Sequence, residues 1–213
     1  WVSPMLARGS RGVPVDLSAW SLEPKWDGWR CLARIDGGEL RLTSRWRNDL
    51  TSRFPELGEL PDALAERRLL LDGELVALRS DGSQDFDALL ARRRSARLVF
   101  VTFDVLHVDG RQLVDAPYSV RRHELEELAV RDHHWLTTPA ALDEAAAALY
   151  GFTLDHGWEG VVAKRLDSSY RPASRDGAWL KAKHPHARDL QADRSEWAPR
   201  SRLSPSGSLI VFS

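Results

Sequence analysis

The chain has 213 residues, a formal net charge of −1 and one cysteine. This length allows one large domain, or one domain and the start of a second, and the near-zero charge excludes a uniformly basic nucleic-acid-binding surface. The single Cys31 excludes an intrachain disulfide and a cysteine zinc cluster. No apolar run reaches the roughly 18 residues of a membrane span, and the first residues lack the layout of a signal peptide, so we expect a cytoplasmic protein without a membrane partner.

The first predicted elements are an irregular arm and a set of short strands. Residues 1–20 are rich in Gly and Pro and predict the arm. Between residues 20 and 42, alternating apolar positions predict three strands separated by turns. Asp36-Gly37 lies between two of these runs and is typical of a hairpin.

Hydrophobic periodicity predicts the remaining elements. In chain order they are a helix over 55–67, a strand over 69–78 that bends around Gly73, a short helix over 86–94, a strand over 98–106, helices over 120–130 and 140–156, and strands over 160–164 and 178–183. Strands and helices interleave without regular βαβ repeats. The predicted fold class is therefore α+β, with mixed, largely antiparallel sheets flanked by helices.

Lysine is scarce in this chain. Of its 30 basic residues, 26 are arginine, and the four lysines are Lys25, Lys164, Lys181 and Lys183. A chain with this bias uses arginine where a plain positive charge suffices. Each lysine therefore indicates a need for a compact ammonium, or for an amine that can lose a proton and act as a nucleophile. Chance is the alternative, and it is disfavoured because all four lysines fall in short segments with other signs of chemistry.

The segment from Lys25 to Arg30 has the sequence Lys-Trp-Asp-Gly-Trp-Arg. A lysine nucleophile that attacks phosphorus needs neighbouring charged groups, close backbone approach and cations that neutralise the phosphate. Asp27, Gly28 and Arg30 supply these residue types beside Lys25. The alternative is a surface turn in which the lysine and the aspartate face water.

This segment resembles the Lys-x-Asp-Gly-x-Arg signature of the covalent nucleotidyltransferases, which are DNA ligases, RNA ligases and mRNA capping enzymes. The other motifs of that family are resembled, in order, by Ser44-Arg45, Asp72-Gly73-Glu74, Phe103-Asp104-Val105-Leu106, Glu159-Gly160-Val161-Val162-Ala163-Lys164 and Trp179-Leu180-Lys181-Ala182-Lys183. The amino-acid sequences of the first and last motifs are most similar to those of bacterial ATP-dependent DNA ligases of the end-joining repair type.

The resemblance implies a fold, ligands and partners. The fold implied is the ATP-grasp-like nucleotidyltransferase domain of DNA ligases, over residues 21–186. The ligands implied are ATP, as the donor of AMP, and Mg²⁺. Nicked or broken double-stranded DNA and DNA-repair proteins are the implied partners, with a nucleoid-associated location in the cytoplasm.

The resemblance also implies residue roles. Lys25 would attack the α-phosphate of ATP, Glu159 would be the metal-associated carboxylate, and Asp27 would order Lys25 or the metal. The remaining implied contacts are Glu23 at the adenine edge, Phe103 stacked on the base, Arg30 and Glu74 at the ribose, Lys164, Lys181 and Lys183 around the triphosphate, and Arg45 at the 5′-phosphate of the nick.

Other interpretations of these residues stay open. Phe103 fits core packing about as well as base stacking, and Glu74 fits a solvated strand end. Lys181 and Lys183 share one face of a strand, where pairing with acidic neighbours is the alternative. The arginines of 92–94 and 121–122 fit phosphate contacts and solvated helix faces equally well, and the seven scattered histidines show no zinc-site spacing.

Two departures from the family pattern limit the functional hypothesis. The second motif has Arg47 where the family has glycine, which would crowd a tight turn. Residues 187–213 are too few for the five strands of an OB barrel, so we expect them to be the incomplete start of an OB-fold domain or a disordered tail. The alternatives to a DNA ligase are an RNA ligase, a capping-type enzyme, or an inactive truncated ligase that only binds nucleotide or DNA.

Overall fold

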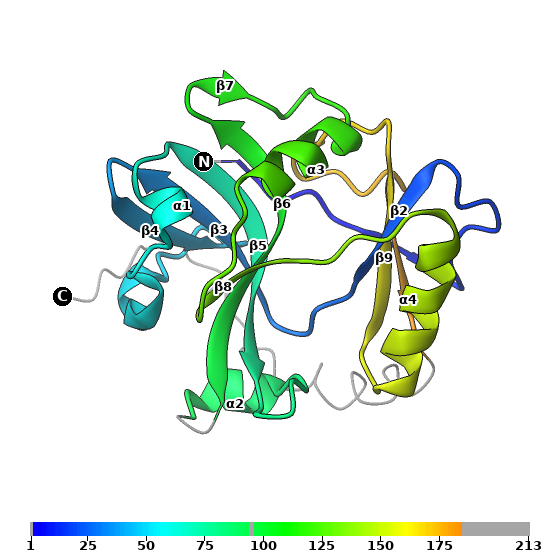
Figure 1. Cartoon of the computed structure of the whole chain (residues 1–213), viewed down its shortest axis with the longest axis horizontal. Helices are drawn as coiled ribbons and strands as arrows, with labels where there is room; N and C mark the ends of the chain where they lie inside the picture. Colours follow the sequence, from blue (N-terminus) through cyan, green and yellow to red (C-terminus); the bar gives the residue numbers. More distant parts are fainter. Residues whose placement is uncertain (1, 94–95, 185–213) are drawn as a thin grey trace, which may run out of the picture.

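The computed structural model of the chain describes residues 2–93 and 96–184 and contains two β-sheets (Figure 1). The large sheet has the order β4 (Glu39–Ser44), β3 (Trp29–Asp36), β5 (Leu69–Leu78), β6 (Arg97–Val108) and β7 (Arg111–Gln112), with β8 (Trp135–Thr137) beside β6. The small sheet has the order β1 (Arg8–Ser10), β10 (Trp179–Lys183), β9 (Gly160–Arg165) and β2 (Trp20–Pro24). Only the β1–β10 and β6–β8 pairs are parallel among the named strands, so the predicted mixed, largely antiparallel architecture is confirmed.

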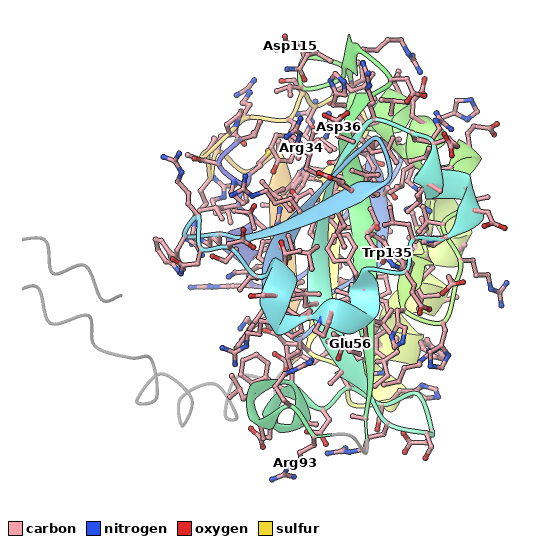
Figure 2. All side chains as sticks on the ribbon, turned by 90° about the vertical axis from the view of Figure 1, so that its left-hand side faces the viewer. Arg34, Asp36, Glu56, Arg93, Asp115 and Trp135 are labelled. Carbon is pink, nitrogen blue, oxygen red and sulfur yellow. The ribbon has the colours of Figure 1, made fainter. Side chains whose placement is uncertain are left out.

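The β3–β4 hairpin forms where the sequence predicts it. In the second half of β3, residues alternate between the core, with Ala33 and Ile35 buried, and solvent, with Arg34 exposed. This alternation is the period of a strand that has one buried face. In the side view of Figure 2, Arg34 and Asp36 lie at this hairpin, whereas Trp135 lies inside the molecule; its ring packs edge-on against Phe100 at 5.2 Å.

The long strands β5 and β6 form the middle of the large sheet and are almost entirely buried. Both have near-continuous apolar sequences because both of their faces are covered. Their pairing changes register between Asp72 and Gly73, which is where the sequence predicts a bend.

The helices lie against the faces and ends of the two sheets (Figure 1). They are α1 (Asp62–Ala65), α2 (Phe86–Ala91), α3 (Tyr118–Glu127) and α4 (Asp143–Asp155). The helix α4 packs on the small sheet, where Leu22, Val161 and Ala182 form a cluster with Ala146. The opposite face of this sheet is thereby left to face the large sheet.

The single helix expected over 55–67 is wrong. The structure has a 3₁₀ turn at Pro55–Leu57 and a four-residue helix α1, separated by Gly58 and the residues up to Pro61. Proline disfavours helical geometry in the residue before it, so the chain cannot continue one helix through Leu60. The leucine spacing still marks the buried side, since Leu57 and Leu64 are both in the core.

The segment 1–20 is more ordered than the expected irregular arm. Its strand β1 pairs with β10, and the side chain of Met5 is buried in a cluster with Phe103, Tyr170 and Trp179. The expected tail over 187–213 lies outside the described residues. Within the described part of the chain, no helix has the length and apolar character needed to cross a membrane.

Candidate active site

One face of the small sheet carries most of the predicted chemistry. Strand pairing places Glu23 opposite Val162, and Val162 opposite Lys181. Lys164 and Lys183 are two residues away from these positions along their strands, so their side chains point to the same face. The alternate residues face α4 instead. Strand geometry therefore gathers side chains that are up to 160 residues apart in sequence.

Lys25, directly after β2, forms an ion pair with Glu159, which directly precedes β9. The Lys25 Nζ atom lies 2.5 Å from Glu159 Oε2, and the Lys183 Nζ atom lies 2.7 Å from Oε1. Burial would raise the pKa of Glu159, but Lys25 and Lys183 outweigh it and lower that pKa. Glu159 is therefore an ionised carboxylate held between two ammonium groups.

Two glycines allow the backbone to close around this pair. A β-carbon on Gly28 would lie 2.0 Å from the carbonyl oxygen of Leu75, so the turn after Lys25 can approach β5 only with glycine there. Gly160 has φ +143°, and a β-carbon there would lie 2.1 Å from the Ala182 oxygen. The Gly160 carbonyl accepts the backbone N–H of Lys25 at 2.8 Å, which fixes the start of the motif against β9.

Arg30 is held by a bidentate ion pair with Asp72. Its Nε and Nη2 atoms each lie 2.5 Å from one Asp72 oxygen, and the Tyr170 hydroxyl donates to Asp72 Oδ2 at 2.6 Å. Burial would lower the pKa of Arg30, but Asp72 outweighs burial and raises it. The guanidinium carbon also lies 4.5 Å from the centroid of the Phe103 ring, so the cation is fixed in orientation.

A second buried carboxylate, Glu23, is held by two donors. Its Oε1 accepts a short hydrogen bond from the Tyr118 hydroxyl, and its Oε2 lies 2.9 Å from Lys164 Nζ. Lys164 also donates to the Phe103 carbonyl at 2.8 Å. Burial lowers the pKa of Lys164, against the opposing effect of Glu23.

A cavity of about 210 Å³ lies between the two sheets and brings the predicted residues together. Eight of the predicted site residues line it: Glu23, Lys25, Arg30, Arg45, Glu74, Phe103, Lys164 and Lys181. Arg45 is exposed at the end of β4, where its guanidinium lies 4.9 Å from the Trp46 ring.

Glu159, Lys183 and Asp27 are predicted site residues that do not line the cavity. Glu159 and Lys183 are adjacent to it through Lys25. Asp27 is half-buried, and its backbone N–H donates to the Gln84 side chain at 2.6 Å.

Burial shifts the pKa values of two side chains in the cavity wall. It raises the pKa of Glu74 to about 7, although Arg30 and Lys25 act in the opposite direction. It lowers the pKa of Lys181, and the nearby cations Lys25, Lys183 and Arg175 lower it further. The cavity can therefore change its charge within the range of neutral pH.

The structure adds residues to the predicted site. Leu6, Ala7 and Arg175 also line the cavity, as does Trp179, and Tyr118 lies behind it against Glu23. Trp179 belongs to the last motif, and its place in the cavity wall agrees with the prediction that tryptophans near the motifs could line the pocket. The others come from segments without a motif, and only the long-range packing brings them to the site.

Two expectations about arginines change. Arg121 is not a phosphate contact, because it is fully buried and forms a bidentate ion pair with Asp104 at 2.8 and 3.0 Å. Arg47 does not prevent the tight turn expected of glycine: it adopts φ +68°, and its backbone N–H donates to the Ser44 carbonyl at 2.9 Å.

A family model described as the ATP dependent DNA ligase domain matches residues 4–183. This chain therefore belongs to the ATP-dependent DNA ligase family. The resemblance and the fold class expected from the sequence are both confirmed.

Individual relatives agree with this assignment. The multifunctional non-homologous end joining DNA repair protein LigD of Mycobacterium tuberculosis is 39% identical over 210 residues, which is 99% of this chain and 27% of the relative. A probable DNA ligase of Streptomyces coelicolor is 36% identical over 225 residues, covering 98% of this chain and 44% of the relative. A solved mycobacterial DNA ligase D complexed with ATP and MES superimposes with a TM-score of 0.77 and 39% identity, covering 86% of this chain and 60% of that one. The chain thus spans about a quarter of the length of LigD.

Proposed function

We propose that this domain performs the nucleotidyl-transfer chemistry of an ATP-dependent DNA ligase, with Lys25 as the nucleophile. The observation that carries the proposal is the position of Lys25, whose side chain lines a cavity between two sheets and is anchored by the buried Glu159. Lys181 and Arg45 line the same cavity and have no carboxylate within 4 Å among the described residues. Unneutralised cations in a cavity favour a ligand with several negative charges, as a triphosphate has.

In the first step, the Lys25 nitrogen forms a bond to the α-phosphorus of ATP. The Lys25 ammonium first gives up a proton to water, so that the neutral amine attacks that phosphorus. The bond from the phosphorus to the bridging oxygen then breaks, pyrophosphate leaves with the electron pair, and the second proton lost from the nitrogen also passes to water. Glu159 orients the attacking group, while Lys181 and Lys183 stabilise negative charge on the phosphate oxygens. Arg30 and Glu74 contact the ribose in this proposal, and Phe103 stacks on the base.

A magnesium ion at this site would be held by few protein groups together with the bound nucleotide. No cluster of three or more carboxylate, histidine or cysteine side chains suited to a metal occurs in the described parts of the chain. Mg²⁺ is commonly held by one or two carboxylates together with phosphate oxygens and water. Glu159 is the carboxylate that would hold it, with Asp27 as the neighbouring acidic residue. The ion would neutralise charge on the phosphates.

In the second step, AMP passes from Lys25 to the 5′-phosphate of nicked or broken double-stranded DNA. The 3′-hydroxyl then attacks that phosphate and releases AMP. The exposed Arg45 is the proposed contact to the 5′-phosphate. Action on broken chromosomes would place the protein at the nucleoid with end-binding repair proteins as partners.

Covalent labelling tests the first step. The chain is incubated with Mg²⁺ and ATP labelled at the α-phosphate, and the labelled residue is located by peptide mapping. We expect a label on Lys25 that is lost in Lys25→Arg, because a guanidinium keeps the charge but is not a nucleophile. Arg111→Lys, on the surface far from the cavity lining, is the control. A label that persists in Lys25→Arg would refute the role of Lys25.

Nicked DNA tests the second step. The labelled protein is freed of ATP and mixed with a nicked duplex that carries a 5′-phosphate, or with nicked RNA or capping substrates. Transfer of the label to DNA supports the proposal. Transfer only to RNA, or no transfer to any substrate, would instead support the RNA-ligase or inactive alternatives.

A further inference from the structure

Three polar side chains are buried together beside the cavity, and each comes from a different element. Glu23 of β2 is 2% exposed, Lys164 of β9 is 1% exposed and Tyr118 of α3 is 0% exposed. Glu23 and Lys164 also line the cavity, together with Phe103 and Trp179. Burying charged groups at a ligand cavity is unfavourable unless they are paired, so the arrangement of their partners matters.

Each oxygen of Glu23 already accepts from one donor. The Tyr118 hydroxyl donates to Oε1, and the Lys164 ammonium lies 2.9 Å from Oε2. Lys164 is fixed in turn, because it donates to the Phe103 carbonyl at 2.8 Å. Its Nζ atom lies 4.4 Å from the centroid of the Trp179 ring and 4.7 Å from that of Phe103. Glu23 therefore cannot rotate its carboxylate without leaving a buried donor unsatisfied.

The two donors limit how Glu23 can meet a purine. A free carboxylate can accept two parallel hydrogen bonds, and guanine offers such a pair from its N1–H and 2-amino groups. Adenine offers a single donor group at this edge, the 6-amino group. Tyr118 and Lys164 each occupy one acceptor site on a different oxygen, so together they fix the directions in which the remaining acceptor sites of Glu23 point.

We propose that Tyr118, with Lys164, determines the nucleobase choice of this enzyme by holding the Glu23 carboxylate in the orientation in which it accepts from the 6-amino group of adenine. Tyr118 is thus a positioning residue that acts through Glu23. Lys164 belongs to the base-recognition group rather than to the triphosphate contacts that the family resemblance implies. This inference rests on the proposed nucleotidyl transfer to Lys25.

Selectivity of self-labelling tests the inference. The rates of Lys25 labelling are compared for ATP, GTP and the triphosphate of purine riboside, which lacks the 6-amino group. In the unmodified protein we expect the 6-amino group to raise labelling efficiency about tenfold, the value of one hydrogen bond to a charged acceptor. In Tyr118→Phe we expect the preference for ATP over GTP to fall about tenfold, with part of the change a gain for GTP.

Tyr170→Phe is the matched control. Tyr170 is also buried, and its hydroxyl also donates to a carboxylate, Asp72, but Asp72 does not line the cavity. We expect this variant to lose similar thermal stability and keep the ATP-to-GTP ratio. An unchanged ratio in Tyr118→Phe, or an equal fall in both variants, would overturn the inference.

The analogue comparison needs no variant, so it decides the matter even where Tyr118→Phe does not fold. Equal labelling by ATP and the purine riboside triphosphate in the unmodified protein would overturn the inference while the proposed function stands. The proposed function itself fails in a different way, namely when no nucleotide labels Lys25.

Discussion

Lysine occurs in this protein only around two buried carboxylates and the cavity beside them. Lys25 and Lys183 contact Glu159, Lys164 contacts Glu23, and Lys181 lines the cavity. The scarcity of lysine was therefore an informative feature of the sequence. The scarcity of lysine does not predict which lysine is buried, because the burial of Lys164 depends on the packing of three aromatic rings around it.

Glu74 gives the site a measurable dependence on pH. Burial raises the pKa of Glu74 in the folded chain to about 7, above the ordinary value of 4.5. Between these two pH values, Glu74 is mostly protonated in the folded chain and mostly ionised in the unfolded chain. Stability contributed by this group is present below pH 4.5 and is lost as pH rises towards 7. In Glu74→Gln this loss is absent.

Urea denaturation at several pH values measures the effect. We expect the difference in unfolding free energy between the unmodified protein and Glu74→Gln to fall by about 1–3 kcal/mol between pH 5 and pH 8. Glu39→Gln, on the exposed end of β4, should show no such trend. A difference that is constant across this range would show that Glu74 ionises normally in the folded chain.

Elements were predicted best where their own sequence determines them. The β3–β4 hairpin has alternating residues and an Asp-Gly turn, and β5 and β6 have long apolar runs, so local pattern sufficed. The strand β1 has only three residues and no such pattern. It forms because its backbone pairs with β10. The site was predictable as far as its motifs reach, whereas Tyr118 and Arg175 come to it through tertiary packing.

The turn after β4 shows how an element tolerates an unusual residue. Arg47 has φ +68°, a conformation that strains residues with a β-carbon by about 1–2 kcal/mol. We expect Arg47→Gly to raise the unfolding free energy by about 1 kcal/mol. Glycine relieves this strain in the folded chain, and its greater entropy in the unfolded chain offsets part of the gain. Chemical denaturation checks this value.

The control for this turn is Arg47→Ala, which removes the same side chain but keeps the β-carbon. It should not gain stability. Equal stabilisation by alanine and glycine would mean that the side chain of Arg47, and not its backbone conformation, is unfavourable.

At the scale of the molecule, a buried ion pair connects the two sheets. Arg121 of α3 binds Asp104 of β6, and its Nη1 atom donates to the carbonyls of Ala116 and Ser168 at 2.6 and 3.0 Å. Ser168 belongs to the connection between β9 and β10 of the small sheet. One guanidinium therefore joins the large sheet, a helix and the connection in the small sheet.

Removing one partner of this pair leaves a buried charge without compensation. We expect Asp104→Leu or Arg121→Met to lower the unfolding free energy by about 3–5 kcal/mol. The double variant Asp104→Leu/Arg121→Met should recover much of the loss. Glu124→Gln, which breaks the exposed pair with Arg111, should lower it by less than about 1 kcal/mol. Additive losses in the double variant would contradict the coupling of the two charges.

The cavity has one wall from each sheet, and this has a mechanical consequence. An occupant that touches both walls braces them against separation, and it does so only in the folded chain. At a concentration about a hundred times its Kd, such an occupant adds about 2.7 kcal/mol to the free energy of unfolding. Filling the cavity should thus stabilise the contact between the two sheets, so that a bound nucleotide would support the fold before it reacts.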